Sequence, residues 1–174
     1  MTQNCEIAQL GADVLRQISA KVENINSPAI RKIIDEMTTT LANTQGVGLA
    51  APQISQLQRI IIVASRPSTR YPHAPLMLPT VMVNPSYEAL SEQTEKDWEG
   101  CLSIPGIRAL VPRYTSITVQ YEDVQGLTVQ SILEGFVARV FQHEIDHLDG
   151  TVYLDRVETN TDIISESEYF KLFV

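Results

Sequence analysis

Apolar residues recur every three or four positions in two segments of the chain. The first covers residues 28–43 and has the period of an amphipathic helix. Ser27 and Pro28 stand at its start, and a capping serine followed by proline is typical of a helix N-terminus. The second covers residues 135–148 and is apolar around more of its circumference. It predicts a second long helix in the centre of the fold, ended by Gly150.

Between the two predicted helices, the apolar pattern is that of strands. Residues 59–64 (RIIIVA) are short, apolar and β-branched, which predicts a buried strand. Residues 81–84 predict another strand, which is expected to end before Pro85. Residues 116–121 and 127–133 predict a hairpin, because two strand-like runs flank a short turn sequence.

Two further segments lack this apolar periodicity. Residues 66–79 carry four prolines and predict a long loop, in which His73 is expected to be exposed to solvent. Residues 91–99 are polar and are also expected to be exposed. Strands grouped between two helices, with no repeat and no linker, predict an α+β fold. We expect residues 1–174 to form one compact domain, with mostly antiparallel strands packed around the second helix.

Composition narrows the classes of function. The chain has 174 residues, 44% of them hydrophobic, and a formal net charge of −8. No run of lysine or arginine offers a basic face, so we expect no direct binding of nucleic acid and none of an anionic membrane surface. The N-terminal sequence lacks the features of a signal peptide, and two cysteines do not make a disulfide framework. These features predict a cytoplasmic protein.

The segment QHEIDHLDG, residues 142–150, contains two of the three histidines. In a helix, His147 returns to within roughly 40° of His143, one turn along, so both imidazoles can bind one metal ion. Glu144 is turned aside and can reach a water on the metal without binding the ion. Two surface histidines on a polar stripe would be the alternative, but the apolar helix around them favours a metal site.

A catalytic metal site usually has three protein ligands and one open position. His73 is expected in the exposed loop, and Tyr153 occupies the place of the third histidine of the metzincin pattern. Glutamates near the C-terminus are available. Cys101, in the segment EGCLS, is the preferred candidate, because a soft thiolate can complete a Cys/His/His set. On its own, a cysteine there would more often be a small buried hydrophobe.

The segment GVGLAAPQ, residues 46–53, contains two closely spaced glycines. It is no phosphate-binding loop, because the third glycine and the Lys-Ser/Thr pair are missing. Two interpretations stay open: a helix C-cap with a turn, or a strand-like edge that a substrate backbone can approach closely. In the second case, Gln53 could donate a hydrogen bond from its amide to an oxyanion.

Taken together, GVGLAAPQ, EGCLS and QHEIDHLDG resemble the peptide deformylases, a family marked by GxGxAAPQ, EGCLS and QHExDHLxG in this order. No position of the three patterns is mismatched. The resemblance implies a compact α+β hydrolase that removes the formyl group from the N-terminal formyl-methionine of new polypeptides and releases formate. It implies N-formylmethionyl nascent peptides as partners and a transient contact with the ribosome. The C-terminal segment DIISESEYFKLFV is short and acidic, unlike the basic helix of common bacterial members.

By position, the resemblance implies that Cys101, His143 and His147 hold one divalent metal ion. Ferrous iron is expected in the cell, with zinc, nickel or cobalt able to replace it. The metal-bound water is the implied nucleophile, and Glu144 is the implied general base and then general acid.

The resemblance also implies which groups bind the substrate. The backbone N–H of Leu102 and the amide of Gln53 face the formyl oxygen, and Gly48 pairs with the substrate backbone. The candidate residues for the methionine pocket are Val47, Phe136, Arg139 and Val140. Apolar walls favour the methionine side chain. Arg139 is expected to add its apolar stem, with its guanidinium in solvent at the rim.

Overall fold

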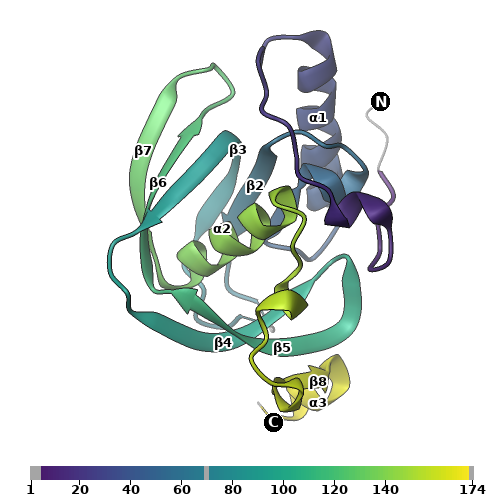
Figure 1. The fold of residues 1–174 in the computed structure, drawn as a ribbon, viewed down its shortest axis with the longest axis vertical. Helices are drawn as coiled ribbons and strands as arrows, with labels where there is room; N and C mark the ends of the chain where they lie inside the picture. Colours follow the sequence, from purple (N-terminus) through teal and green to yellow (C-terminus); the bar gives the residue numbers. More distant parts are fainter. Residues whose placement is uncertain (1–4, 69–70, 173–174) are drawn as a thin grey trace.

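The computed structural model describes residues 5–68 and 71–172, which form an α+β fold with two antiparallel sheets (Figure 1). The larger sheet has the strand order β1-β2-β3-β6-β7, and the smaller has the order β4-β5-β8. The strands are β1 (Gly48–Ala50), β2 (Ile60–Ser65), β3 (Met77–Ala89), β4 (Thr94–Cys101), β5 (Ile104–Tyr114), β6 (Ser116–Glu122), β7 (Thr128–Glu134) and β8 (Ile163–Ser165). The α-helices are α1 (Pro28–Ala42), α2 (Gly135–Leu148) and α3 (Glu166–Lys171).

Both long helices form where the apolar period predicts them. The side chain of Ser27 accepts a hydrogen bond from the N–H of Ile30 and caps α1. This satisfies one of the N–H groups that the first turn of a helix leaves without a partner. Helix α2 covers residues 135–148, and Gly150 follows it with a positive φ of 72°, a conformation that favours glycine.

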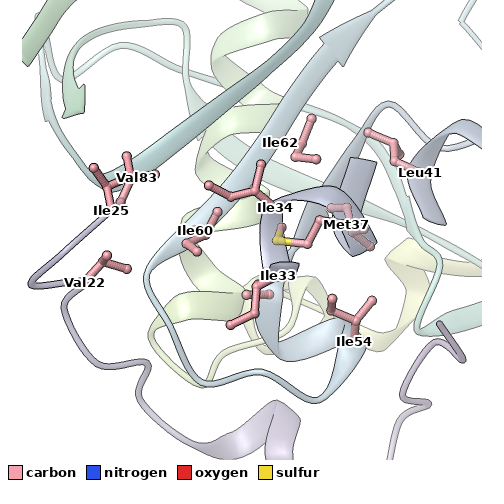
Figure 2. Close-up of a cluster of buried hydrophobic side chains, with 12 residues drawn as sticks. Val22, Ile25, Ile33, Ile34, Met37, Leu41, Ile54, Ile60, Ile62 and Val83 are labelled. Atoms are coloured by element: carbon pink, nitrogen blue, oxygen red, sulfur yellow. The ribbon is translucent and has the colours of Figure 1, made fainter. Parts of the chain in front are cut away.

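Strand β2 is the centre of the core because both of its faces are buried. Ile60 and Ile62 pack against α1 in one cluster, which Figure 2 shows around Met37. Ile61 and Val63 point the other way and pack against α2 in a second cluster. Side chains alternate between the two faces of a strand, so one short strand joins both helices. Each such side chain contributes about 1.5–3 kcal/mol when fully buried. Helix α2 is thereby fixed at the position where it presents its histidines.

The prediction that a strand ends before Pro85 is wrong. Strand β3 continues through Pro85 to Ala89, with a register shift between Val83 and Ser86 in its pairing with β6. A proline lacks the N–H of a regular ladder, and such an irregularity accommodates it. Asn84 lies in the shifted region with a φ of 50°. Its side chain holds the backbone of Val22 through two hydrogen bonds of 2.8 and 2.9 Å.

The two segments without apolar periodicity differ from each other. His73 is exposed, as predicted, and the proline-rich loop is irregular up to β3, which begins within the expected loop at Met77. Thr69 and Arg70 of this loop lie outside the described residues. Residues 91–99 are mostly exposed, but they form much of strand β4, and Glu99 at their end is buried. Within the described ranges, no helix is long and apolar enough to cross a membrane.

Candidate metal centre and active site

Three side chains from two elements converge on one buried point. Helix α2 carries His143 and His147, whose ring centroids lie 5.2 Å apart. Cys101 is the last residue of β4, and its Sγ lies 3.2 Å from Nε2 of His147. One ligand atom from each of the three lies within 4.8 Å of the others. A thiolate with two imidazoles is a donor set that suits zinc or iron, so these residues fit the metal ion that the sequence predicts.

The surroundings favour the ligating form of the cysteine. Burial by itself would raise the pKa of the Cys101 thiol, but the neighbouring imidazoles of His147 and His143 outweigh it and hold this pKa well below its usual value. The backbone N–H of Ser103 also points to Sγ, at 3.4 Å. A deprotonated thiol is the form that binds metals, so the protein prepares this ligand in advance.

Glu99 orients one of the histidines. Its Oε2 lies 2.8 Å from Nδ1 of His143. A carboxylate only accepts hydrogen bonds, so Nδ1 carries the proton and Nε2 stays free to bind a metal. Burial alone would raise the pKa of Glu99. The charge of Arg113 and the hydrogen bonds that His143 and Arg113 donate to the carboxylate instead lower this pKa far below its usual range. Glu99 is the first residue of EGCLS, but no role was predicted for it, and the polar pattern of residues 91–99 predicted it to be exposed.

Glu99 is held by a chain of ion pairs that is buried as far as Asp146 and ends at the half-exposed Arg156. Arg113 donates to both carboxylate oxygens of Glu99, at 2.8 and 3.0 Å, and to Asp146 at 2.6 Å. Asp146 also accepts from Arg156 at 2.8 Å. Asp146 belongs to the HEIDH segment. The motif therefore contains, besides Glu144, a second carboxylate, which holds Arg113 in place beside Glu99. Sequence patterns gave no sign of the partners of Asp146, because isolated arginines such as Arg113, on β5, and Arg156, in a short 3-10 helix, read as solvent-exposed.

Glu144 is buried next to the ligand atoms. Its Oε2 has no hydrogen-bond partner among the described residues. Burial raises the pKa of Glu144 to about 7, although His143 and His147 act in the opposite direction. A carboxyl group with a pKa near neutrality can both take up and release a proton, which is what general acid–base chemistry requires.

Gln53 is locked by hydrogen bonds at both ends of its amide. Oε1 accepts from the N–H of Ala50 at 2.9 Å, and Nε2 donates to Oγ of Ser103 at 3.1 Å. The same nitrogen lies 3.5 Å from Sγ of Cys101. Residues 48–50 form β1, an edge strand of the larger sheet, so this part of GVGLAAPQ is strand-like, and residues 51–54 form a 3-10 helix. Leu102 follows the metal ligand and lines the same cavity as Gln53.

A cavity of about 190 Å³ opens beside these groups. It brings together all five residues predicted for the substrate site: Val47, Gly48, Phe136, Arg139 and Val140. Several other lining residues were not predicted from the sequence, among them Tyr71, Trp98, Arg108 and Glu166. These four come from a loop, from two strands and from the C-terminal helix, so no local pattern could have collected them.

The prediction for the guanidinium of Arg139 is wrong. Arg139 is only 7% exposed, and its guanidinium does not reach solvent at the rim. It donates to Glu99 at 3.0 Å and to the carbonyl oxygens of Val111 and Glu95, both at 2.6 Å. A buried carboxylate is stable only when cations and donors compensate its charge, and this requirement outweighs the tendency of arginine to extend into water. Only the stem of Arg139 can serve the cavity.

A helix with two histidines, a cysteine from a neighbouring strand and a buried carboxyl group with an oxygen that no described residue binds are the site of a metal-dependent hydrolase. Comparison with known proteins specifies the class further. Residues 4–162 match the family described as polypeptide deformylase. The chain is 52% identical to peptide deformylase 2 of Nostoc sp. over 166 residues, which cover 95% of this chain and 93% of that one. It is 44% identical to peptide deformylase 1 of Bordetella pertussis over 89% of this chain and 88% of that one.

Solved structures agree with this assignment. A class I type b peptide deformylase from Acinetobacter baumannii, described as bound to Met-Ala-Ser, superposes with a TM-score of 0.87 at 42% identity, covering 90% of this chain and all (100%) of that one. The peptide deformylase of Thermotoga maritima gives a TM-score of 0.79 at 34% identity, with 90% and 99% of the two chains covered. The chain therefore belongs to the polypeptide deformylase family, and its activity is that of a peptide deformylase.

Proposed function

We propose that this deformylase hydrolyses the formamide of N-formylmethionyl peptides at a metal ion held by Cys101, His143 and His147, and that Glu144 moves the proton. The position of Glu144 carries the proposal. It is buried beside the three ligands, its pKa is raised to about 7, and its Oε2 has no partner within the described residues.

A divalent metal ion held by these three residues would supply a nucleophile at neutral pH, because a bound metal can lower the pKa of water to about 7. Glu144 takes up the proton of the attacking water and returns it to the nitrogen of the leaving amine. One carboxyl group then serves both halves of the reaction. Glu99 keeps the proton of His143 on Nδ1 throughout, because it accepts the hydrogen bond at that nitrogen.

Negative charge develops on the formyl oxygen during the attack, and two donors stabilise it. We assign these donors to the side-chain amide of Gln53 and the backbone N–H of Leu102. The two hydrogen bonds that fix the amide of Gln53 support this assignment, because a donor that is already oriented need not reorganise during the reaction. Loss of one such donor lowers the rate on the order of 100-fold or more.

The methionine side chain enters the part of the cavity between Val47, Phe136 and Val140, beside the stem of Arg139. Edge strand β1 offers the backbone of Gly48 for pairing with the peptide, in the manner of an added strand. The relative from Acinetobacter baumannii is described with Met-Ala-Ser bound. Met-Ala-Ser has the sequence of a deformylated peptide, so its presence in that relative supports the proposed binding of formyl-Met peptides in the cavity of this protein.

We further propose ferrous iron as the metal in the cell, with zinc, nickel or cobalt able to replace it. Thiolate and imidazole ligands suit these ions, whereas magnesium and calcium prefer oxygen. Metal analysis of protein purified without oxygen from its native host tests this assignment. Iron in close to one equivalent per chain is the expected result, and zinc in its place would contradict it.

We place residues 1–174 in one catalytic unit that acts in the cytoplasm on nascent chains, with only transient contact to the ribosome. The net charge of −8 supports a contact that involves no direct grip on nucleic acid. The described residues 163–172, which pair with β5 through β8 and contact it through α3, carry no basic run that would support docking on RNA.

Release of formate from formyl-Met-Ala-Ser is the test of the proposed function. The metal-loaded protein should release one formate per peptide, and Cys101→Ala should lose both metal and turnover. Cleavage of internal peptide bonds instead would identify an endoprotease. Metal binding without any turnover would identify a binding protein that has kept only the fold.

A further inference from the structure

The C-terminal segment contributes to the substrate cavity. Strand β8 pairs with β5, with Ile164 opposite Arg108 and Ser165 opposite Ile107. Helix α3 begins at the next residue, Glu166, which lines the cavity together with Arg108. Residues that follow the last family motif therefore extend the sheet that carries Cys101.

Arg108 is the centre of this contact. It is 3% exposed, and its Nη2 donates to Oε1 of Glu166 at 2.7 Å. Its Nη1 donates to the hydroxyl of Tyr71 at 2.8 Å, and its Cζ lies 5.1 Å from the ring centroid of Tyr169. The guanidinium is thus held by a carboxylate, a phenol and an aromatic face, which come from a loop and from α3.

This guanidinium also lies against the backbone that leads to the metal ligand. A Cβ atom on Gly100 would lie 2.5 Å from Nη1 of Arg108, so only glycine allows the two to approach this closely. Tyr71, which binds Arg108, also contacts Phe136: the centroids of the two rings lie 4.7 Å apart. Tyr71 and Arg108 line the same cavity as Cys101 and Phe136, so they are available to contact a peptide beyond its formyl end and its methionine.

We propose that Glu166 and Tyr71 hold Arg108 as a charge-neutralised wall of the cavity, and that this wall selects uncharged over acidic side chains after the methionine of the substrate. Glu166 already occupies Nη2 of Arg108, so an acidic substrate side chain at this wall meets the carboxylate of Glu166 in place of a free guanidinium of Arg108. Without that carboxylate, the buried guanidinium would accept an acidic side chain in its place. This inference rests on the proposed function, because it concerns selection among its substrates.

The test compares formyl-Met-Ala-Ser with formyl-Met-Asp-Ser on the metal-loaded protein. In Glu166→Gln, the kcat/KM for the Asp peptide should rise about tenfold relative to the Ala peptide, the factor expected for one hydrogen bond to a charged group. Glu168→Gln is the matched control. It makes the same change of charge on the same helix, but its side chain is 58% exposed and pairs with Lys171. The ratio should stay as in the wild type.

Trp98 offers a readout that needs no turnover. It is the single tryptophan of the chain, it lines the cavity, and its ring lies 5.7 Å from that of Tyr169. Titration of the product peptides Met-Ala-Ser and Met-Asp-Ser, followed by Trp98 fluorescence, should give the same tenfold relative gain for the Asp peptide in Glu166→Gln. If the wild type does not turn over formyl-Met-Ala-Ser, the proposed function fails, and this titration still decides the role of the wall.

A purely structural role of Glu166 would lower kcat/KM for both peptides by the same factor. An unchanged Asp-to-Ala ratio in Glu166→Gln, or an equal rise in Glu168→Gln, would overturn the proposal. Tyr71→Phe is the second variant, should Glu166→Gln fail to fold. It removes the hydroxyl that accepts from Nη1 of Arg108, and it should shift the ratio in the same direction by a smaller factor. An unchanged Asp-to-Ala ratio of kcat/KM in a folded Tyr71→Phe protein would likewise contradict the proposed role of Arg108, Glu166 and Tyr71.

Discussion

The carboxyl group of Glu144 lies directly against Gly48. A Cβ atom on Gly48 would lie 2.2 Å from Oε1 of Glu144 and 2.7 Å from its Cδ. The residue that we propose to move the proton is therefore in contact with the strand that we propose to hold the peptide. No residue larger than glycine fits between them unless Glu144 shifts.

Gly48→Ala should displace the carboxyl group of Glu144 and leave the metal in place. A displacement of about 1 Å at a reacting group can cost on the order of 100-fold in rate. We expect kcat to fall by about that factor. Steady-state kinetics and metal analysis of the purified variant provide the measurement. Wild-type kcat in Gly48→Ala would show that the position of Glu144 is not critical.

A double-mutant cycle can test whether the two residues act together. Glu144→Asp shortens the side chain and removes the steric conflict with a methyl group at position 48. The loss that it causes should be smaller in the Gly48→Ala background than in the wild type, since contacting residues are not additive. Strict additivity would mean that the two substitutions act independently.

Glu144→Gln should abolish turnover and leave the metal content near that of the wild type. Glutamine has nearly the same shape as glutamate but cannot accept the proton of the attacking water. Formate release and metal content are measured on the same preparation. A variant that purifies without metal would identify Glu144 as a ligand and refute its role as the proton carrier.

The apolar walls of the cavity should favour methionine at the N-terminus of the substrate. Each buried methylene contributes about 0.8 kcal/mol, so formyl-Met peptides should exceed formyl-Ala peptides in kcat/KM by roughly 10- to 200-fold. The guanidinium of Arg139 is bound to Glu99 and backbone carbonyls, so formyl-Glu peptides should gain nothing from it. A wild-type preference for formyl-Glu that Arg139→Leu removes would disprove this assignment.

Arg139→Leu should destabilise the protein without reversing its preference for methionine. Glu99 would lose one of its cations in a buried site, and removing one partner of a buried ion pair costs on the order of 3 kcal/mol. Denaturant unfolding of the metal-free protein measures the change. Arg16→Leu is the control, because its ion pair with Asp155 is exposed and such pairs contribute about 0–1 kcal/mol. An equal decrease in the free energy of unfolding in the two variants would contradict a structural role for Arg139.

The iron form should lose activity in air faster than a nickel-exchanged form. A ferrous ion beside the Cys101 thiolate is open to oxidation, and the thiolate can itself be oxidised. Activity is followed over time under air and under argon for both metal forms. Equal decay rates of the two forms in air would rule out oxidation at the metal as the cause of the loss.

Local patterns were sufficient for the helices, whose backbone hydrogen bonds are local. The ends of α2 and the cap at Ser27 follow from apolar period and capping chemistry. Strand β4 was missed because the side chains that it directs outward are polar, and it depends on its pairing with β5. Similarly, β3 passes Pro85 only because of the register shift near Asn84, which a strand pattern does not reveal.

The same distinction holds for the site. Its ligands lie in short motifs with fixed spacing, so the sequence contained them. The motifs also contain two of the supporting carboxylates, Glu99 and Asp146, but not their partners: Arg113 lies on the strand next to that of Glu99, and Arg108 and Glu166 are 58 positions apart. Charged residues in such places read as solvent-exposed until the fold brings them together. The wrong prediction for Arg139 arose in this way, since its partner Glu99 lies 40 positions away.

The metal ligands come from both layers of the fold. Cys101 ends a strand of the smaller sheet, and His147, 46 positions later, lies on the helix packed against the larger one. An ion held by both is therefore a cross-link between the layers, and it stabilises the folded chain more strongly the more tightly it binds. When a cell runs short of the metal, this protein becomes easier to unfold as well as inactive, and thus more accessible to proteases. Metal supply would then control how much of the enzyme survives, and not only how fast it works.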